Sequence, residues 1–240
     1  MKKILITGGA GKIGSHFISQ NKEKYDFIVL DKKRPIDESV DYIIGDLSDV
    51  DVLSKACKGV DIVLHLAGIP SADTPFDLVL AANMLGTKNL LDSMLENNIS
   101  KIIFASSAQT IEGYEKDIQI DETMPTLPGN YYGISKVFGE SLLSYLSKSS
   151  GVKAICLRIG AYEFPEDFTE MNARDMSAYL HPDDLNQLLN KCIESIDTFD
   201  FEIFNAISNN TYKRLNITKA KRLLNYTPQY NSFNLFKLKQ

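Results

Sequence analysis

Short apolar runs alternate with longer amphipathic segments through the first 160 residues of the chain. The runs lack polar alternation, which is typical of strands buried on both faces, and the longer segments repeat apolar residues every three to four positions, as helices do. The predicted strands are residues 3–7, 26–30, 42–44, 61–66, 101–105 and 153–158, and the predicted helices are 12–22, 49–58, 76–97 and 130–149. Ser48 is the predicted N-cap of the second helix, and residues 108–129 are predicted to form a polar loop. This alternation predicts an α/β fold with a doubly wound, parallel Rossmann sheet.

The pattern loosens after Gly160. A charged, loop-like stretch over residues 164–176 precedes the last predicted elements, which are a helix from about residue 182, a strand at 201–205 and a helix at 216–225. We therefore expect a Rossmann domain over residues 1–160 and a small C-terminal part over 161–240, some of whose segments return to the sheet.

Composition and charge exclude several classes of function. The net charge is −5 without a basic stripe, which disfavours nucleic acid and anionic membranes as partners. No apolar stretch reaches the length needed to span a bilayer. Three cysteines lie far apart and three histidines do not cluster, so we expect no disulfides, no metal site and a cytoplasmic location.

Three glycines form the first candidate site. Gly8, Gly11 and Gly14 stand between the first strand and the first helix, where a tight loop and a helix N-terminus suit a pyrophosphate. Asp31 closes the second strand and can accept hydrogen bonds from both adenosine ribose hydroxyls, which favours NAD over NADP. The plainer alternatives are a tight turn for the glycines and a strand-end turn for Asp31.

Tyr132 and Lys136 form the second candidate site. Their spacing of four places both on one helix face, where an ammonium can lower the pKa of a phenol that acts as a base. Ser106 and Ser107 end the fifth strand, at the edge where parallel sheets bind ligands. We expect one serine to form a turn and the other to be catalytic.

With these motifs in view, the chain resembles the extended short-chain dehydrogenase/reductase family, the NAD-dependent epimerase/dehydratase family, over nearly its whole length. Further motifs that carry the resemblance are Gly45-Asp46-Leu47, His65-Leu66-Ala67-Gly68, Asn83 with Gly86-Thr87, and Leu157-Arg158-Ile159-Gly160. The resemblance implies Ser107, Tyr132 and Lys136 as the catalytic residues. It implies that NAD is bound by Gly8, Gly11, Lys12, Ile13, Gly14, Asp31, Asp46, Leu47, Leu66, Ala67, Gly68, Asn83, Tyr132 and Lys136.

Within that family the chain looks most similar to uronate dehydrogenases. The likeness rests on Gly68-Ile69-Pro70-Ser71, on the segment from Tyr132 to Glu140, and on Arg158-Ile159-Gly160 followed by Asn172-Ala173-Arg174. It implies that Arg174 binds a substrate carboxylate and that Ser71 and Ser107 line the substrate pocket. Two positions depart from the subfamily, because Ala108 replaces an asparagine and Ala161 replaces a serine. Both changes remove hydrogen-bonding groups from the expected sugar pocket.

We therefore expect an NAD-dependent oxidoreductase that acts on a small sugar or sugar acid, with Tyr132 as the base. A nucleotide-sugar epimerase, dehydratase or reductase is the alternative, and a non-catalytic NAD-sensing protein is a third. Only about 80 residues follow Gly160, which leaves little room for a nucleotide-sugar domain. Family analogy also suggests a homodimer formed through the helices predicted at residues 76–97 and 130–149.

Overall fold

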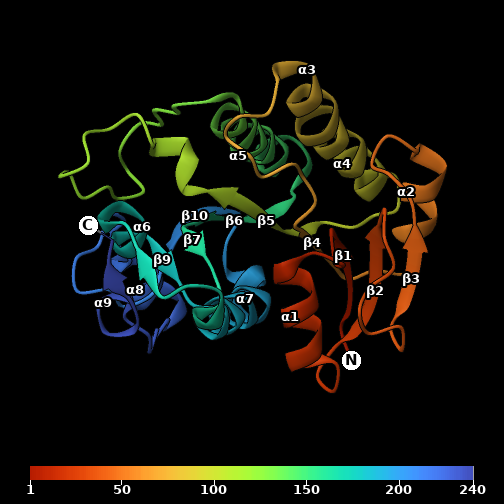
Figure 1. Cartoon of the computed structure of the whole chain (residues 1–240). Helices are drawn as coiled ribbons and strands as arrows, with labels where there is room; N and C mark the ends of the chain where they lie inside the picture. Colours follow the sequence, from red (N-terminus) through yellow and green to blue (C-terminus); the bar gives the residue numbers. More distant parts are fainter. Residues whose placement is uncertain (240) are drawn as a thin grey trace.

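The computed structural model describes residues 1–239 and centres on a sheet of seven parallel strands, in the order β10-β6-β5-β4-β1-β2-β3 (Figure 1). The strands are β1 Lys3–Thr7, β2 Asp26–Asp31, β3 Asp41–Ile44, β4 Ile62–His65, β5 Lys101–Ser107, β6 Lys153–Ile159 and β10 Phe201–Ala206. The order reverses direction at β1, which places β1 and β4 at the switch point where such sheets bind ligands. The predicted doubly wound Rossmann sheet is confirmed.

Helices cover both faces of the sheet (Figure 1). The main ones are α1 Lys12–Asn21, α2 Val50–Ala56, α4 Gly86–Glu96, α5 Tyr131–Ser150, α7 Pro182–Ser195 and α8 Thr218–Leu224. Side chains of α1, α7 and α8 share one hydrophobic core with the sheet, and side chains of α2, α4 and α5 share the other. No helix among residues 1–239 is long and apolar enough to cross a membrane.

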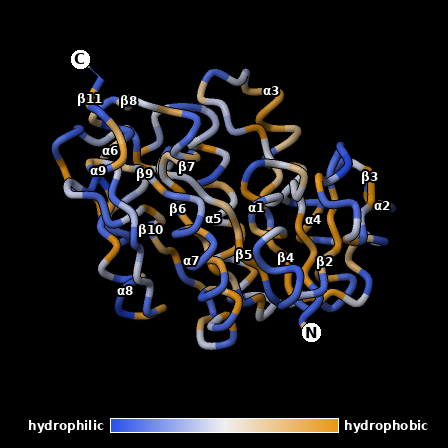
Figure 2. Tube along the Cα trace, turned by 60° about the horizontal axis from the view of Figure 1, so that its bottom comes forward, coloured by the Kyte–Doolittle hydropathy of each residue, from blue (hydrophilic) through white to orange (hydrophobic). Residues whose placement is uncertain are grey.

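Alternating side chains of each central strand enter opposite cores. In β1, Ile4 and Ile6 belong to the core beneath α1, while Leu5 belongs to the core beneath α4. All three are fully buried, and burial of one such side chain contributes about 1.5–3 kcal/mol. This is why the middle of β1 is apolar at consecutive positions, and Figure 2 shows hydrophobic residues concentrated around β2 and β4.

The part after β6 adds small elements at one end of the sheet. They are β7 Ala161–Tyr162, β8 Glu170–Met171, α6 Ala173–Ser177, β9 Tyr179–Leu180, α9 Ser232–Leu235 and β11 Lys237–Leu238. β7 pairs with β9, and β8 pairs with β11, each in parallel. β10 returns to the main sheet beside β6, so this part of the chain is joined to the Rossmann sheet rather than separate from it.

Three local predictions need correction. Asp49, rather than Ser48, caps α2, because the Ser48 N–H donates to Asp46 and the Asp49 carboxylate accepts from Val52. The helix predicted over 76–97 is interrupted, with a π-helical turn at Leu80–Leu85 between α3 Phe76–Val79 and α4. The stretch after β5, predicted as a loop, begins with the 3-10 helix Ala108–Ile111.

A buried ion pair fixes α5 against the sheet. The Arg158 guanidinium on β6 donates from Nε and Nη2 to the two carboxylate oxygens of Glu140 on α5, each at 2.9 Å. The side chains are 2% and 5% exposed. Ser106 on β5 donates to Glu140 Oε1 at 2.6 Å, so one carboxylate connects a helix to two strands.

We expect Glu140→Gln to lower the free energy of unfolding by about 3–5 kcal/mol, because it leaves the Arg158 charge buried without its partner. Urea unfolding measures this. The matched control is Asp92→Asn, which breaks an exposed pair with Lys88 and is expected to cost less than about 1 kcal/mol. If the two variants lose equal unfolding free energy, the Glu140–Arg158 pair does not have the stabilising role assigned to it.

Candidate functional site

The glycine loop presses against the end of β4. Gly8 has a φ of +73°, and a Cβ there would lie 2.7 Å from the backbone nitrogen of Ala67. A Cβ on Gly14 would lie 2.5 Å from the Cα of Gly9. Side chains at these positions would push the loop away from β4, so glycine is required for this close approach.

The first turn of α1 offers unoccupied hydrogen-bond donors. Gly11 is its N-cap, no side chain caps the helix, and the first turn holds no acid. Its backbone N–H groups and partial positive charge therefore suit an anionic ligand. Lys12 is exposed and pairs with Glu163 at 3.2 Å, while Ile13 packs against the core.

Asp31, Asp46 and Leu47 lie around the ends of β2 and β3. Asp31 accepts from the N–H groups of Ala10 and Lys33, at 3.1 and 3.0 Å, so its carboxylate is fixed beside the glycine loop. Each carboxylate oxygen retains a further lone pair for a ligand hydroxyl. Asp46 pairs with Lys32, which lowers the pKa of its carboxyl, and Leu47 is buried.

The segment after β4 forms the next wall of the site. Leu66 donates to Thr7 O, and Ala67 donates to the Thr7 hydroxyl, which continues the alignment of β4 with β1. Gly68 is exposed with a φ of +153°. Asn83, 4% exposed, accepts from Ile69 N–H at 2.7 Å.

The Asn83 amide also donates to Ile69 O and to the Ser135 hydroxyl. It therefore ties the π-helical turn to the segment after β4 and to α5. These three bonds all lie within the protein, and direct contact of Asn83 with a cofactor stays a prediction.

α5 lies unusually close to the strand that carries Ser107. A Cβ on Gly139 would lie 2.4 Å from Phe104 Cζ, and one on Gly133 would lie 2.3 Å from Gln109 O. Asn130 caps the helix through Gly133 N–H and also donates to the Gln109 side chain at 2.7 Å. These contacts hold the first turn of α5, and with it Tyr132, against the end of β5.

The structure brings Ser107, Tyr132 and Lys136 together. Ser106 is committed to Glu140, while Ser107, on the opposite face of β5, caps the following 3-10 helix through Gln109 N–H. Burial raises the pKa of the Tyr132 phenol, and the nearby Ser107 hydroxyl acts in the opposite direction. Ser107 is thus the serine that reaches the tyrosine.

Lys136 is a buried cation, 4% exposed. Its Nζ lies 5.5 Å from the centre of the Tyr132 ring and 4.9 Å from that of Phe104. Burial lowers its pKa to about 8, and none of the hydrogen bonds or ion pairs found within residues 1–239 involves its Nζ. The ammonium is close to the phenol, but the pKa of Tyr132 is raised and not lowered as expected, because burial is the largest influence on it and Ser107 is what opposes it.

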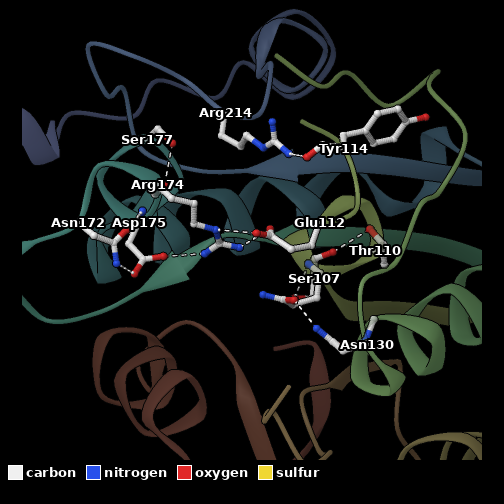
Figure 3. Close-up of polar contacts among 12 residues, drawn as sticks. Ser107, Thr110, Glu112, Tyr114, Asn130, Asn172, Arg174, Asp175, Ser177 and Arg214 are labelled. Carbon is white, nitrogen blue, oxygen red and sulfur yellow. Dashed lines mark hydrogen bonds and ion pairs between the residues drawn. The ribbon is translucent and has the colours of Figure 1, made fainter. Parts of the chain in front are cut away.

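The two remaining predicted residues differ in their surroundings. Ser71 is exposed in the segment between β4 and α3 and accepts from Asp73 N–H. Arg174, on α6, is half-buried and pairs with Glu112 and Asp175 (Figure 3). Glu112 was not singled out in the sequence, because it is one of several acids in a polar stretch and lies 62 positions from Arg174.

Comparison with known proteins places the chain in a family. The model of the NAD dependent epimerase/dehydratase family matches residues 4–184. The chain belongs to this family. Among similar proteins of Haloferax volcanii are an NAD-dependent glucose-6-phosphate dehydrogenase (30% identity, 95% of this chain and 94% of that one) and an L-arabinose 1-dehydrogenase (NAD(P)(+)) (33% identity, 97% and 98%).

A solved structure agrees with this assignment. A mutant of uronate dehydrogenase from Agrobacterium tumefaciens, complexed with NAD, superposes with a TM-score of 0.88 at 25% identity, covering 98% of this chain and 87% of that one. The predicted family, its likeness to uronate dehydrogenases, the NAD cofactor and an enzyme of the short-chain dehydrogenase/reductase type are confirmed. The roles of the individual residues stay predictions.

The geometry fits a dinucleotide. The glycine loop, the uncapped turn of α1 and the Asp31 carboxylate lie consecutively along the ends of β1 and β2, as pyrophosphate and ribose binding requires. The Lys136 ammonium, which has no acceptor within the described chain, lies 3.6 Å from where a Cβ of Gly68 would stand. Residues 1–239 contain no group of three or more His, Cys, Asp or Glu side chains that could hold a metal ion.

We expect Lys136→Met to stabilise the protein at about pH 7 by up to about 3 kcal/mol, because the buried ammonium is removed. The pKa of Lys136 is about 8 in the fold against an ordinary 10.5. Between these two pH values the unfolded chain binds more protons than the folded protein, so the unfolding free energy of the wild type increases as the pH rises. The stability difference between Lys136→Met and the wild type therefore disappears. Urea unfolding at about pH 7 and about pH 10 measures the difference.

Lys148→Met, on the exposed side of the same helix, is the control for this prediction. It should change stability by less than about 0.5 kcal/mol at both pH values. A Lys136→Met protein that is less stable at neutral pH contradicts the prediction.

Proposed function

We propose that this enzyme oxidises a hydroxyl group of a small sugar or sugar acid, with Tyr132 as the base. The convergence of Ser107, Tyr132 and Lys136 at the carboxyl ends of the strands, beside the dinucleotide cradle, is the observation that carries the proposal. Relatives named as dehydrogenases of glucose 6-phosphate, arabinose and uronate support a sugar as the substrate.

Each side chain has a role that follows from its surroundings. Tyr132 in its phenolate form takes the proton of the substrate hydroxyl. Ser107, which lies near the phenol, holds the substrate oxygen beside it. Lys136 is the cation beside the ring, and its charge favours the phenolate. NAD, when bound, supplies the acceptor for the hydride that leaves the same carbon.

The close contacts around α5 keep this arrangement rigid. Gly133 and Gly139 let the helix approach β5, and the Glu140–Arg158 pair fixes its depth. A proton-transfer pair is effective only at hydrogen-bonding distance, so these contacts position the catalytic groups without touching the substrate.

We expect Tyr132→Phe to lower kcat/KM for NADH formation by about 10²–10⁴-fold, because the proton acceptor is lost, and to change NADH affinity only a few-fold. The assay offers NAD with glucuronate, galacturonate, neutral aldoses and UDP- and dTDP-sugars. Tyr131→Phe, which alters the neighbouring exposed tyrosine, is the control and should retain activity.

The same assay distinguishes the alternatives. Conversion of nucleotide sugars without turnover of any free sugar favours the epimerase class. A Tyr132→Phe enzyme that retains full activity contradicts the role of the base.

We also propose that two copies of the chain associate through α5 and the helical segment from α3 to α4. Large hydrophobic side chains are exposed on both: Phe76, Leu78, Leu85, Tyr131, Ile134 and Tyr145. A cluster of this kind is typical of an interface between subunits. Light scattering should give a dimer mass for the wild type and a monomer mass for Leu78→Glu/Tyr145→Glu, and a monomeric wild type contradicts the proposal.

A further inference from the structure

The Arg174 guanidinium is already bound to carboxylates of the chain. Its Nε and Nη2 donate to the two carboxylate oxygens of Glu112, at 3.2 and 2.5 Å, and its Nη1 donates to Asp175 at 2.6 Å (Figure 3). A bidentate pair of this kind has the geometry that a carboxylate ligand of an arginine would adopt. Glu112 therefore occupies the side of Arg174 on which an anionic ligand would bind.

This pair lies one short helix away from Ser107. Ser107 begins the 3-10 helix Ala108–Ile111, and Glu112 directly follows its last residue. Five residues at a rise of about 2 Å place the two backbones roughly 10 Å apart. Figure 3 shows Arg174 extending from α6 toward this helix, with Ser107 next to the Glu112 side of the pair.

The carboxylates around the pair already offset its positive charges. Arg214 lies close enough to influence both Glu112 and Arg174 and donates to the backbone oxygens of Tyr114 and Ile118. Two guanidinium groups thus lie near the carboxylates of Glu112 and Asp175, and Glu115 and Asp117 add further negative charge around Arg214. A substrate carboxylate or phosphate placed here would be an uncompensated anion unless it displaced Glu112.

Displacement of Glu112 is unfavourable. Arg174 and Glu112 side chains are only 23% and 26% exposed, so their hydrogen bonds are partly shielded from water. Charge-assisted bonds in such surroundings are stronger than neutral ones, and breaking them leaves Glu112 without its partner. The pair nevertheless retains enough exposure to contact a small molecule.

We propose that Glu112 is a specificity-determining residue that makes this enzyme select uncharged aldoses over sugar acids and sugar phosphates. The inference rests on the proposed sugar oxidation and narrows its substrate class. It changes the role expected for Arg174, which holds Glu112 instead of the substrate. The uncharged sugar then contacts a neutral ion pair whose remaining lone pairs can accept hydroxyl protons.

The test compares sugars that differ only at C6. NADH formation is measured for glucose against glucuronate and for galactose against galacturonate, with wild type and Glu112→Gln. The wild type should have the higher kcat/KM for the neutral member of each pair. Glu112→Gln should shift the acid-to-neutral ratio of kcat/KM toward the acid by about tenfold or more, because Arg174 is released.

Two further variants show whether the shift in the kcat/KM ratio comes from the release of Arg174. Glu112→Gln/Arg174→Ala should abolish it, since the guanidinium that would bind the acid is gone. Glu115→Gln removes the same charge from an exposed position three residues on and should leave the ratio unchanged. Thermal unfolding and NADH affinity show whether each variant is folded. Inhibition of neutral-sugar oxidation by uronates measures how tightly the wild type binds these acids, and it requires no variant.

The outcomes separate this inference from the function beneath it. A wild type that prefers uronates or binds them more tightly than aldoses overturns the inference and leaves sugar oxidation intact. An unchanged acid-to-neutral ratio of kcat/KM in Glu112→Gln also overturns the inference. The same holds if Glu115→Gln shifts this ratio as much as Glu112→Gln does. Intact NADH binding without turnover of any free sugar overturns the proposed function, and the inference with it.

Discussion

The buried ion pair between Glu140 and Arg158 is the interaction on which the site depends. It joins α5 to β6, and through Ser106 it also joins α5 to β5, at the level of the sheet where the candidate catalytic residues begin. Ser107 follows directly on the strand, and Lys136 lies one helical turn before Glu140. Because the pair is inaccessible to water, it resists displacement, and the relative positions of strand and helix follow from it.

Close backbone approach and a low dielectric act together in this site. The glycines at 8, 14, 133 and 139 allow contacts that a methyl group would prevent, and so exclude water around the cradle and around α5. Burial then raises the pKa of Tyr132 and lowers that of Lys136, so the phenolate and the ammonium are each less stable here than in water. Charge brought into such a site is weakly screened, and a ligand that carries it has a large effect.

The fold and the residues that it brings together as candidate catalytic groups were predictable because their signals are local. Apolar runs predicted every strand of the sheet, and fixed spacings predicted the glycine loop and the pair Tyr132–Lys136. The cap at Asp49 was missed because Asp46 competes for Ser48, and the π-helical turn was missed because it depends on the bonds of Asn83 to distant segments. The pairing of Glu112 with Arg174 has no spacing signal, since the two residues meet only through the fold.

The presence of Lys136 also indicates what selection has acted on in this chain. A buried ammonium without a carboxylate partner weakens the fold, and many apolar residues at that position would strengthen it. Random substitution would remove such a residue early in a lineage that no longer needed its chemistry, because its loss carries a stability advantage. Its presence in an otherwise well-packed core therefore indicates continuing selection for the function of this site, in binding the cofactor or in catalysis.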